Sequence, residues 1–439
     1  MANHERKSKV WAVVRVSAGN FLEMYDFMVF GYYAAAIGRA FFPSGNPYVS
    51  LSLSLMTFGA GFLMRPIGAI VLGAYSDRHG RRKGLILALA LMSAGMLSIA
   101  CVPGYAAIGL AAPLLVLSGR LLQGFSAGME LGGVSVYLSE IATPGHKGFY
   151  VSWQSASQQV VVMVAALIGL SLDRWLTAQQ MANWGWRVPL WIGCLVIPVL
   201  LKLQTSLEET DEFRSRKSHP TMGEIFRSLL ANTKLVLIGM LFFTMTTVSF
   251  YMITAYTPTF GTSVLHLASV DSFVVTFCVG VSNLIWLPVM GALSDRIGRM
   301  PLLVACTALM LLTAYPAMLW LVAGPTFGKL LAVELWFSFV YGSYNGALIV
   351  FMTEIIPIEV RTLGFSLAYS LATSLFGGFT PAISTYLIHA TGNRAVPGLW
   401  LSFAAGCGLL AAFLARGRAR DLKSMTLLDA VPVLELKNR

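Results

Sequence analysis

Apolar runs long enough to cross a lipid bilayer recur along this chain from one end to the other. Because an α-helix rises about 1.5 Å per residue, about 20 apolar residues cross the ~30 Å hydrocarbon core of a membrane. Hydrophobic residues make up 56% of the chain and charged residues 12%, which is about half the charged share of a typical soluble domain. These features predict an all-α polytopic membrane protein and exclude a water-soluble fold.

The apolar pattern predicts twelve transmembrane helices. One long polar stretch, 205–232, separates the first six from the last six, and we expect it to be a cytoplasmic linker. The N-terminal half is then 1–204, the C-terminal half is 233–416, and 417–439 is a cytoplasmic tail. The predicted spans are 11–38, 50–74, 84–103, 108–139, 147–171, 187–204, 233–257, 269–293, 301–322, 328–353, 362–389 and 397–416.

Basic residues are distributed unevenly over the predicted loops. The net charge is +11, and most Lys and Arg residues lie in segments that are cytoplasmic when both termini are inside. The outer loops hold Arg39, Arg174, Arg187, Lys329 and Arg394. This is the positive-inside bias that orients membrane proteins, so the charge predicts topology and not nucleic-acid binding. The five cysteines are scattered through apolar spans without the spacing of a disulfide framework or a metal site.

Two segments of the chain occur twice. "GAYSDRHGRRKG" (73–84) returns as "GALSDRIGRMPL" (291–302), and "SEIATPGHKG" (139–148) returns more loosely as "TEIIPIEVRTLG" (353–364). Two six-helix halves therefore repeat in the same orientation, which is typical of transporters that bind substrate between their halves near the membrane midplane. We expect an inner gate of ion pairs and helix-end contacts, made by Gly73, Asp77, Arg78, Arg81, Asp295, Arg296, Glu140 and Glu354. The alternative is that these basic residues only anchor the topology.

These motifs resemble those of the major facilitator superfamily. The loop at 73–82 resembles the signature loop of that superfamily, and "RLLQG" (120–124) resembles its fourth-helix motif. "GNFLEMYDF" (19–27), followed by "MRPIGAIVLGAYSDRHGRR" (64–82), is similar to the metabolite–proton symporter branch, and the whole chain resembles enterobacterial citrate–proton symporters. The resemblance implies a major facilitator fold in the bacterial inner membrane and cation-coupled uptake of citrate or a related tricarboxylate. We expect a functional monomer without a cofactor.

Charged residues inside the predicted spans indicate where the function lies. Glu23 and Asp26 stand three residues apart on one face of the first span, and Glu130 of the fourth span lies at a similar depth. Arg65 lies near mid-membrane in the second span, and Arg120 lies outward of Glu130 in the fourth, about 15 Å from it. Each charge at the centre of a membrane helix costs about 2.5–3.5 kcal/mol on insertion scales, so intramembrane charges are functional candidates by default.

The arginines and nearby polar residues predict an anion site. Guanidinium groups bind carboxylates through two parallel hydrogen bonds, so we expect Arg65 and Arg120 to hold the substrate. The candidates for its remaining oxygen atoms are Tyr32, Gln154, Tyr341, Tyr344 and Asn345. On the tenth span, Glu334, Ser338, Tyr341 and Asn345 share one face, with Glu334 in its outer part.

Carboxylates are the candidates for binding the coupling cation, because no histidine lies near the middle of a predicted span. We expect Asp26 to be ionised and paired with Arg120. The alternative is that this pair only holds the fourth span to the first. Glu23 and Glu130 have no assigned partner and are expected to take up the cation, with Asn20 nearby. The resemblance implies a proton, while sodium at Glu23 and Asp26 remains an alternative, because sodium is a hard cation that prefers oxygen ligands.

Other functions and substrates are weighed against the citrate prediction. A symporter for a zwitterion such as a betaine would use a cation–π cage, whose candidates are Trp153, Trp191, Trp286 and Trp336. A dicarboxylate is a further alternative, and so is a receptor or a channel. A membrane-embedded enzyme is not expected, because the spans show no catalytic grouping of Ser, His and Asp and no phosphate-binding loop. The expected partners are a small anionic substrate and the lipid bilayer, without nucleic acid.

Overall fold

The computed structural model describes residues 21–79, 81–128, 130–205, 232–357 and 361–436. The predicted cation residue Asn20 lies outside these ranges. The predicted residues Asp77, Arg78, Arg81 and Glu130 lie within them, but their side chains are not described. The regular structure of the described residues is helical throughout.

Ten helical segments of the described chain are long and apolar enough to cross a membrane, and each coincides with a predicted span. The two other predicted spans, 11–38 and 108–139, correspond to α2 (Phe21–Tyr32) with α3 (Ala34–Phe41), and to α8 (Ala111–Ala127) with α9 (Glu130–Glu140). The prediction of an all-α membrane protein with twelve spans is confirmed.

The N-terminal half contains long helices joined by short turns. Several of these helices are interrupted near mid-depth, which leaves polar backbone groups where a site can form. Its remaining elements are α4 (Pro47–Phe62), α5 (Arg65–His79), α6 (Arg81–Cys101), α7 (Tyr105–Ile108), α10 (Lys147–Trp175), α11 (Ala178–Asn183), the 3₁₀ turn η1 (Gly185–Arg187) and α12 (Val188–Thr205).

The C-terminal half contains π-helical segments in its seventh and eleventh spans. Pro258 lacks the backbone N–H that an α-helix needs at this point, and π-helical turns flank it on both sides. Such turns are frequent at functional sites. The elements are α15 (Thr233–Tyr251), η2 (Met252–Tyr256), α16 (Thr257–Thr259), η3 (Phe260–Val264), α17 (Ser269–Ile297), α18 (Arg299–Val322), α19 (Phe327–Ile355), α20 (Arg361–Ala372), η5 (Thr373–Gly377), α21 (Thr380–Thr391) and α22 (Pro397–Leu436).

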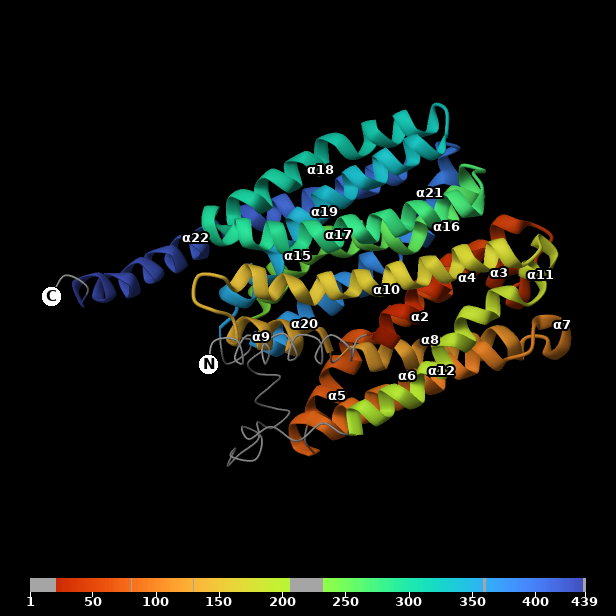
Figure 1. Ribbon diagram of the computed structural model, residues 1–439, viewed down its shortest axis with the longest axis horizontal. Helices are drawn as coiled ribbons and strands as arrows, with labels where there is room; N and C mark the ends of the chain where they lie inside the picture. Colours follow the sequence, from red (N-terminus) through yellow and green to blue (C-terminus); the bar gives the residue numbers. More distant parts are fainter. Residues whose placement is uncertain (1–20, 80, 129, 206–231, 358–360, 437–439) are drawn as a thin grey trace.

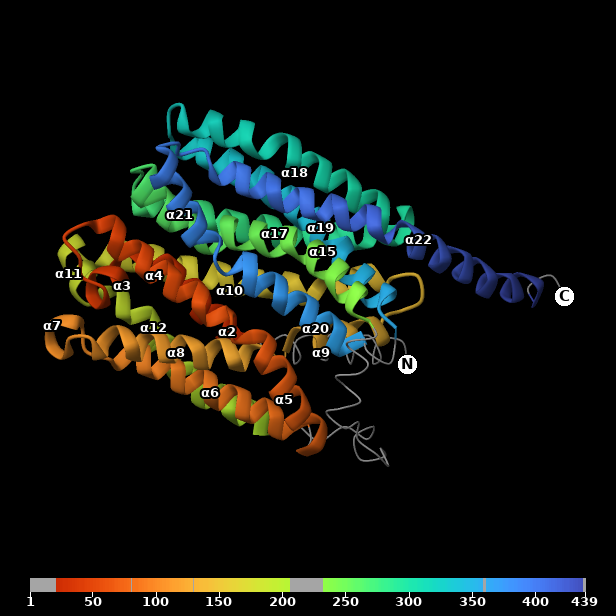
Figure 2. The ribbon, with the colours of Figure 1, turned by 180° about the vertical axis from the view of Figure 1, so that it is seen from behind.

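The helices form two groups that lie side by side (Figure 1). The red-to-yellow helices of the first half make one group and the green-to-blue helices of the second half make the other, and the reverse view shows the same division (Figure 2). The antiparallel pair α10 and α17 has the most extensive contact of any two elements and crosses the seam between the groups. Residues of this pair can therefore link the halves at either end.

Candidate functional site

A close crossing of helices brings the two buried arginines together. A Cβ atom added at Gly124 on α8 would lie 1.6 Å from the carbonyl oxygen of Gly61, and one added at Gly128 would lie 2.2 Å from that of Arg65. Side chains larger than hydrogen would force the helices apart at these positions. Gly124 and Gly128 therefore form a close packing face of α8 against α4 and α5, the helix that carries Arg65.

Arg120 forms a fully buried ion pair with Asp26 on α2. The Nη1 atom of Arg120 lies 2.6 Å from Oδ2 of Asp26, and both side chains are 0% exposed. The same nitrogen donates to Oε1 of Gln123 at 2.8 Å. The predicted Asp26–Arg120 pair is confirmed. Within the described residues, Nε and Nη2 of Arg120 have no hydrogen-bond partner, so this guanidinium retains donors for a ligand.

Arg65 forms a second buried ion pair, with Glu23. Its Nη2 atom lies 2.6 Å from Oε1 of Glu23, and the two side chains are 2% and 8% exposed. The expectation that Glu23 has no arginine partner is therefore wrong, because helix α5 turns Arg65 toward the first span. Arg65 also lies close to the phenol of Tyr369 on α20, in the C-terminal half.

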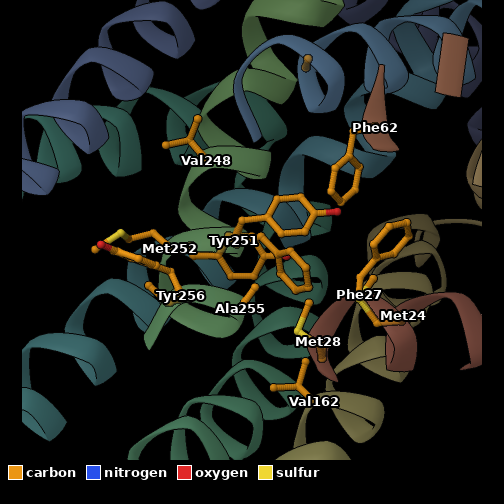
Figure 3. Packing of buried hydrophobic residues seen from close by; sticks show 14 of the residues in the cluster. Met24, Phe27, Met28, Phe62, Val162, Val248, Tyr251, Met252, Ala255 and Tyr256 are labelled. Atoms are coloured by element: carbon orange, nitrogen blue, oxygen red, sulfur yellow. The ribbon is translucent and has the colours of Figure 1, made fainter. Parts of the chain in front are cut away.

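Phenylalanine rings cover both guanidinium groups. The Cζ atom of Arg120 lies 3.7 Å from the centroid of the Phe30 ring, and that of Arg65 lies 4.8 Å from the Phe62 centroid. Desolvated cation–π contacts of this kind contribute about 2 kcal/mol. Figure 3 shows Phe62 next to Tyr251 of the opposite half, and the two ring centroids are 5.1 Å apart. These rings were not among the predicted site residues.

A small cavity lies between the two halves, with a volume of about 10 Å³. A space of this size holds roughly one water molecule, so the halves are closed on one another here. Three of the predicted substrate residues line it, namely Gln154, Tyr341 and Asn345. The complete lining is Gln154, Ser155, Gln158, Thr246, Phe250, Tyr341, Asn345, Ile349, Phe365 and Tyr369.

Four of the predicted substrate residues are not part of this lining, namely Arg65, Arg120, Tyr32 and Tyr344. The hydroxyl of Tyr344 donates to the carbonyl oxygen of Phe242 at 2.9 Å, a contact that joins α19 to α15. The ring of Tyr32 packs edge-on against Phe273, with the centroids 5.7 Å apart. Tyr369 on the eleventh span also lines the cavity and was not among the predicted substrate residues. It stands four residues after Phe365, a spacing that places both residues on one face of a helix.

The inner ends of α10 and α17 are joined by Asp295. Its carboxylate accepts hydrogen bonds from the backbone N–H groups of Gly148 and Phe149 at 2.8 and 3.1 Å. These groups belong to the first turn of α10, where a helix offers free donors and a partial positive charge. The expected contact between Asp295 and a helix N-terminus is confirmed.

The ion pair at this closure is made by Arg299. Arg299, and not the exposed Arg296, contacts Glu354 at 3.0 Å, and it also contacts Asp295 at 2.7 Å. Glu140 is exposed. A Cβ atom added at Gly73 meets no described atom within 4 Å.

The opposite ends of the halves are also in contact. Thr259 of α16 donates to the carbonyl oxygen of Gly31 on α2 at 3.0 Å, and a Cβ atom added at Gly31 would lie 2.8 Å from the carbonyl oxygen of Ala255. Asp173, near the end of α10, lies close to Ser269 at the start of α17. The described conformation is thus closed at both ends of the α10–α17 pair.

The four tryptophans considered for a cation–π cage do not converge on the cavity. Trp191 donates to the carbonyl oxygen of Ala100 at 3.3 Å, and Trp336 donates to Thr313 at 2.9 Å. Trp286 packs on Phe339 and Trp153 on Phe149. Within the described residues, these contacts separate the rings instead of forming an aromatic box.

Two helical bundles, two buried ion pairs, a small cavity between the halves, and contacts at both ends of one helix pair define an alternating-access membrane transporter. Comparison with known proteins agrees with this class. The chain belongs to the sugar (and other) transporter family, whose model matches residues 11–416. It is a multi-pass membrane protein and not an enzyme.

Individual relatives cover nearly the whole chain. It is 58% identical to the citrate-proton symporter of Salmonella typhi over 94% of this chain and 96% of that protein, and 58% identical to that of Klebsiella pneumoniae over 92% and 91%. It is 36% identical to the alpha-ketoglutarate permease of Escherichia coli K12 over 86% and 87%. A crystal structure of a D-xylose-proton symporter superimposes with a TM-score of 0.74 at 18% identity, covering 92% of this chain and 96% of that one, which supports the fold alone.

Proposed function

We propose that this protein is a proton-coupled symporter that takes up citrate or a closely related tricarboxylate by alternating access. The observation that carries the proposal is the pair of buried arginine–carboxylate contacts, Arg65–Glu23 and Arg120–Asp26, beside a cavity lined by hydroxyl and amide groups. The two citrate-proton symporters at 58% identity support the substrate class and favour protons over sodium.

The ion pairs supply a coupling mechanism. A buried guanidinium requires a counter-charge, because an unpaired charge in a low-dielectric interior is strongly destabilising. The counter-charge is either the carboxylate of Glu23 or a carboxylate of the substrate. Protonation of Glu23 releases Arg65 to bind the substrate, so proton and anion binding favour one another. Arg120, with its remaining donors, holds a second substrate carboxylate while Asp26 stays ionised, and Glu130 is the further candidate for a proton.

Charge balance explains why several protons are needed. Moving one negative charge inward against 100 mV costs about 2.3 kcal/mol, so a citrate trianion faces roughly 7 kcal/mol. Co-transport of three protons cancels this cost. The remaining polar groups of the cavity, Gln154, Tyr341, Asn345 and Tyr369, are proposed to bind the hydroxyl and the outer carboxylate oxygens of citrate.

The gate and the topology complete the proposal. We assign the inner gate to Asp295, Arg299 and Glu354, with Asp77 and Arg78 as the repeated copy in the N-terminal half. Both termini, the 205–232 linker and the 417–439 tail face the cytoplasm, and the protein functions as a monomer in a bacterial inner membrane. The halves 1–204 and 233–416 move as the rocking units.

A dicarboxylate is the second candidate substrate, since the alpha-ketoglutarate permease is 36% identical to this chain. A betaine is less well supported, because the tryptophans do not form a box around the cavity.

The deciding experiment is counterflow of labelled citrate in proteoliposomes, with pH and sodium varied independently. Competition by tricarballylate, 2-oxoglutarate and glycine betaine ranks the substrate classes. If the protein exchanges glycine betaine or 2-oxoglutarate but does not exchange citrate, the proposal is contradicted.

A further inference from the structure

Glu334 is a buried acid that the site described above leaves without a role. It lies near the start of α19 and is 2% exposed. At about 1.5 Å of rise per residue, it stands about 10 Å along the helix from Tyr341 of the cavity lining. An acid this deeply enclosed is costly unless a positive group or several donors compensate its charge.

The surroundings of Glu334 do not provide that compensation. Its Oε1 atom contacts the hydroxyl of Thr257 on α16 at 3.1 Å, and Oε2 has no hydrogen-bond partner among the described residues. No described Lys, Arg or His lies within ion-pair distance. Lys329, on the same helix, donates to the carbonyl oxygen of Trp320 instead.

The titratable and polar groups of the neighbouring elements are engaged elsewhere. The hydroxyl of Tyr256 on η2 is hydrogen-bonded to Thr385 at 2.8 Å. From α17, Ser282 and Asn283 contact Ser338 at 2.8 and 2.7 Å. Within the described part of the chain, Thr257 is thus the group that meets the Glu334 carboxyl.

A count of hydrogen atoms shows which form of Glu334 fits this geometry. The hydroxyl of Thr257 has one hydrogen but two acceptors in reach, Oε1 of Glu334 at 3.1 Å and the carbonyl oxygen of Met252 at 3.2 Å. A protonated Glu334 resolves the conflict, because its O–H donates to Thr257 while Thr257 donates to Met252. The second carboxyl oxygen is then a neutral carbonyl, which is far less costly to leave without a partner than an ionised one.

We propose that Glu334 is a proton-binding site in the C-terminal half, separate from the arginine pairs, that carries one of the protons co-transported with the substrate. This assignment rests on the proposed proton-coupled transport.

A line of polar contacts begins one turn along α19 from this acid, at Ser338, and reaches the cavity. Ser338, one turn along α19 from Glu334, donates to Oδ1 of Asn283 at 2.7 Å, and Asn283 donates to Oε1 of Gln159 at 3.1 Å. Gln159 in turn donates to the carbonyl oxygen of Ser155, which lines the cavity, at 3.3 Å. Because Gln159 belongs to α10 and Asn283 to α17, this line crosses between the halves and would break when they separate. The polar line next to Glu334 therefore lies at a contact that the rocking movement changes.

The test counts protons. In proteoliposomes with zero membrane potential and a pH gradient of one unit, each co-transported proton multiplies the plateau accumulation of substrate tenfold. Glu334→Gln imitates the protonated acid, because its amide nitrogen can donate to Thr257, but it cannot release a proton. We expect its citrate plateau to fall about tenfold below that of the wild type, with citrate counterflow retained. Glu140→Gln, at an exposed acid outside this site, should retain the wild-type plateau.

The outcomes separate this inference from the proposed function. A wild-type protein that does not accumulate citrate in response to the pH gradient contradicts the proposed function. If the wild type and Glu334→Gln accumulate citrate to the same plateau, the proton-binding role of Glu334 is wrong and the proposed function still stands. Glu334 is then only a structural contact of Thr257. If Glu334→Gln does not fold, Glu334→Asp provides the second measurement. Its shorter side chain should shift the pH dependence of uptake, and an unchanged pH profile would overturn the inference.

Discussion

Replacing Asp26 by Asn removes the charge that compensates Arg120 while preserving the shape of the side chain. Both members of this pair are 0% exposed and lie 2.6 Å apart, so neither solvent nor a small rotation can restore the balance. Removing one partner of a buried ion pair costs about 3–5 kcal/mol, because the other charge is left in a low-dielectric interior.

The structure places the expected loss near the lower end of this range. Arg120 keeps its hydrogen bond to Gln123 at 2.8 Å and its contact with the Phe30 ring at 3.7 Å, and a desolvated cation–π contact is worth about 2 kcal/mol. We therefore expect a destabilisation of about 3 kcal/mol. For a unit of about 200 residues, a change of 1 kcal/mol shifts the melting temperature by about 2–4 °C, so Asp26→Asn should melt on the order of 10 °C below the wild type.

Thermal unfolding of the detergent-solubilised protein measures this effect. Glu140→Gln is the matched control, because Glu140 is an exposed acid of the same half, and exposed substitutions change stability by less than about 0.5 kcal/mol. The double variant Asp26→Asn with Arg120→Gln removes both charges and should recover much of the lost stability. If Asp26→Asn melts together with the wild type, the pair does not have the buried, mutually compensating role assigned to it.

Three further substitutions test the closure, the packing and the cavity. Asp295→Asn weakens the contact with the α10 N-terminus and should slow transport several-fold with little change in citrate binding; a parallel loss of binding and transport would argue against a gating role. Gly124→Leu cannot be accommodated next to Gly61 and should abolish the folded protein, as seen by size-exclusion chromatography; a normal elution profile would show that the two helices separate easily. Tyr341→Phe should weaken citrate binding about tenfold in a scintillation proximity assay, whereas Tyr344→Phe should not, and the reverse order would mean that the cavity is not the substrate site.

The features that depend on length, composition and repetition were predictable from the sequence. Apolar runs of about 20 residues determine where spans occur, and the repeated loop at 73–84 and 291–302 reveals the parallel halves. Depth along a helix follows from residue number, which is why the pairing of Asp26 with Arg120 could be predicted. The contact of Asp295 with a helix N-terminus followed from its place at a repeated helix end.

The features that depend on helix rotation were not predictable. Tyr341 and Tyr344 are three residues apart, yet one lines the cavity and the other bonds to α15. The Arg65–Glu23 pair requires knowledge of how α5 turns after the interruption that follows Phe62. The π-helical segment before Thr257 adds a residue to a turn and so changes the face on which Thr257 lies, which places it against Glu334 where an ideal helix would not.

The exchange of counter-charges at Arg65 is best tested in Glu23→Gln. Its citrate transport should be measured in proteoliposomes in two ways, as accumulation driven by an acidic exterior and as counterflow without a proton gradient. Glutamine cannot bind or release the coupling proton, but it does not neutralise the positive charge of Arg65 that attracts the substrate. We therefore predict that counterflow persists while gradient-driven accumulation falls well below that of the wild type. A Glu23→Gln variant that accumulates citrate against its gradient as well as the wild type would show that the proton is carried elsewhere and that the Arg65–Glu23 pair does not couple the two fluxes.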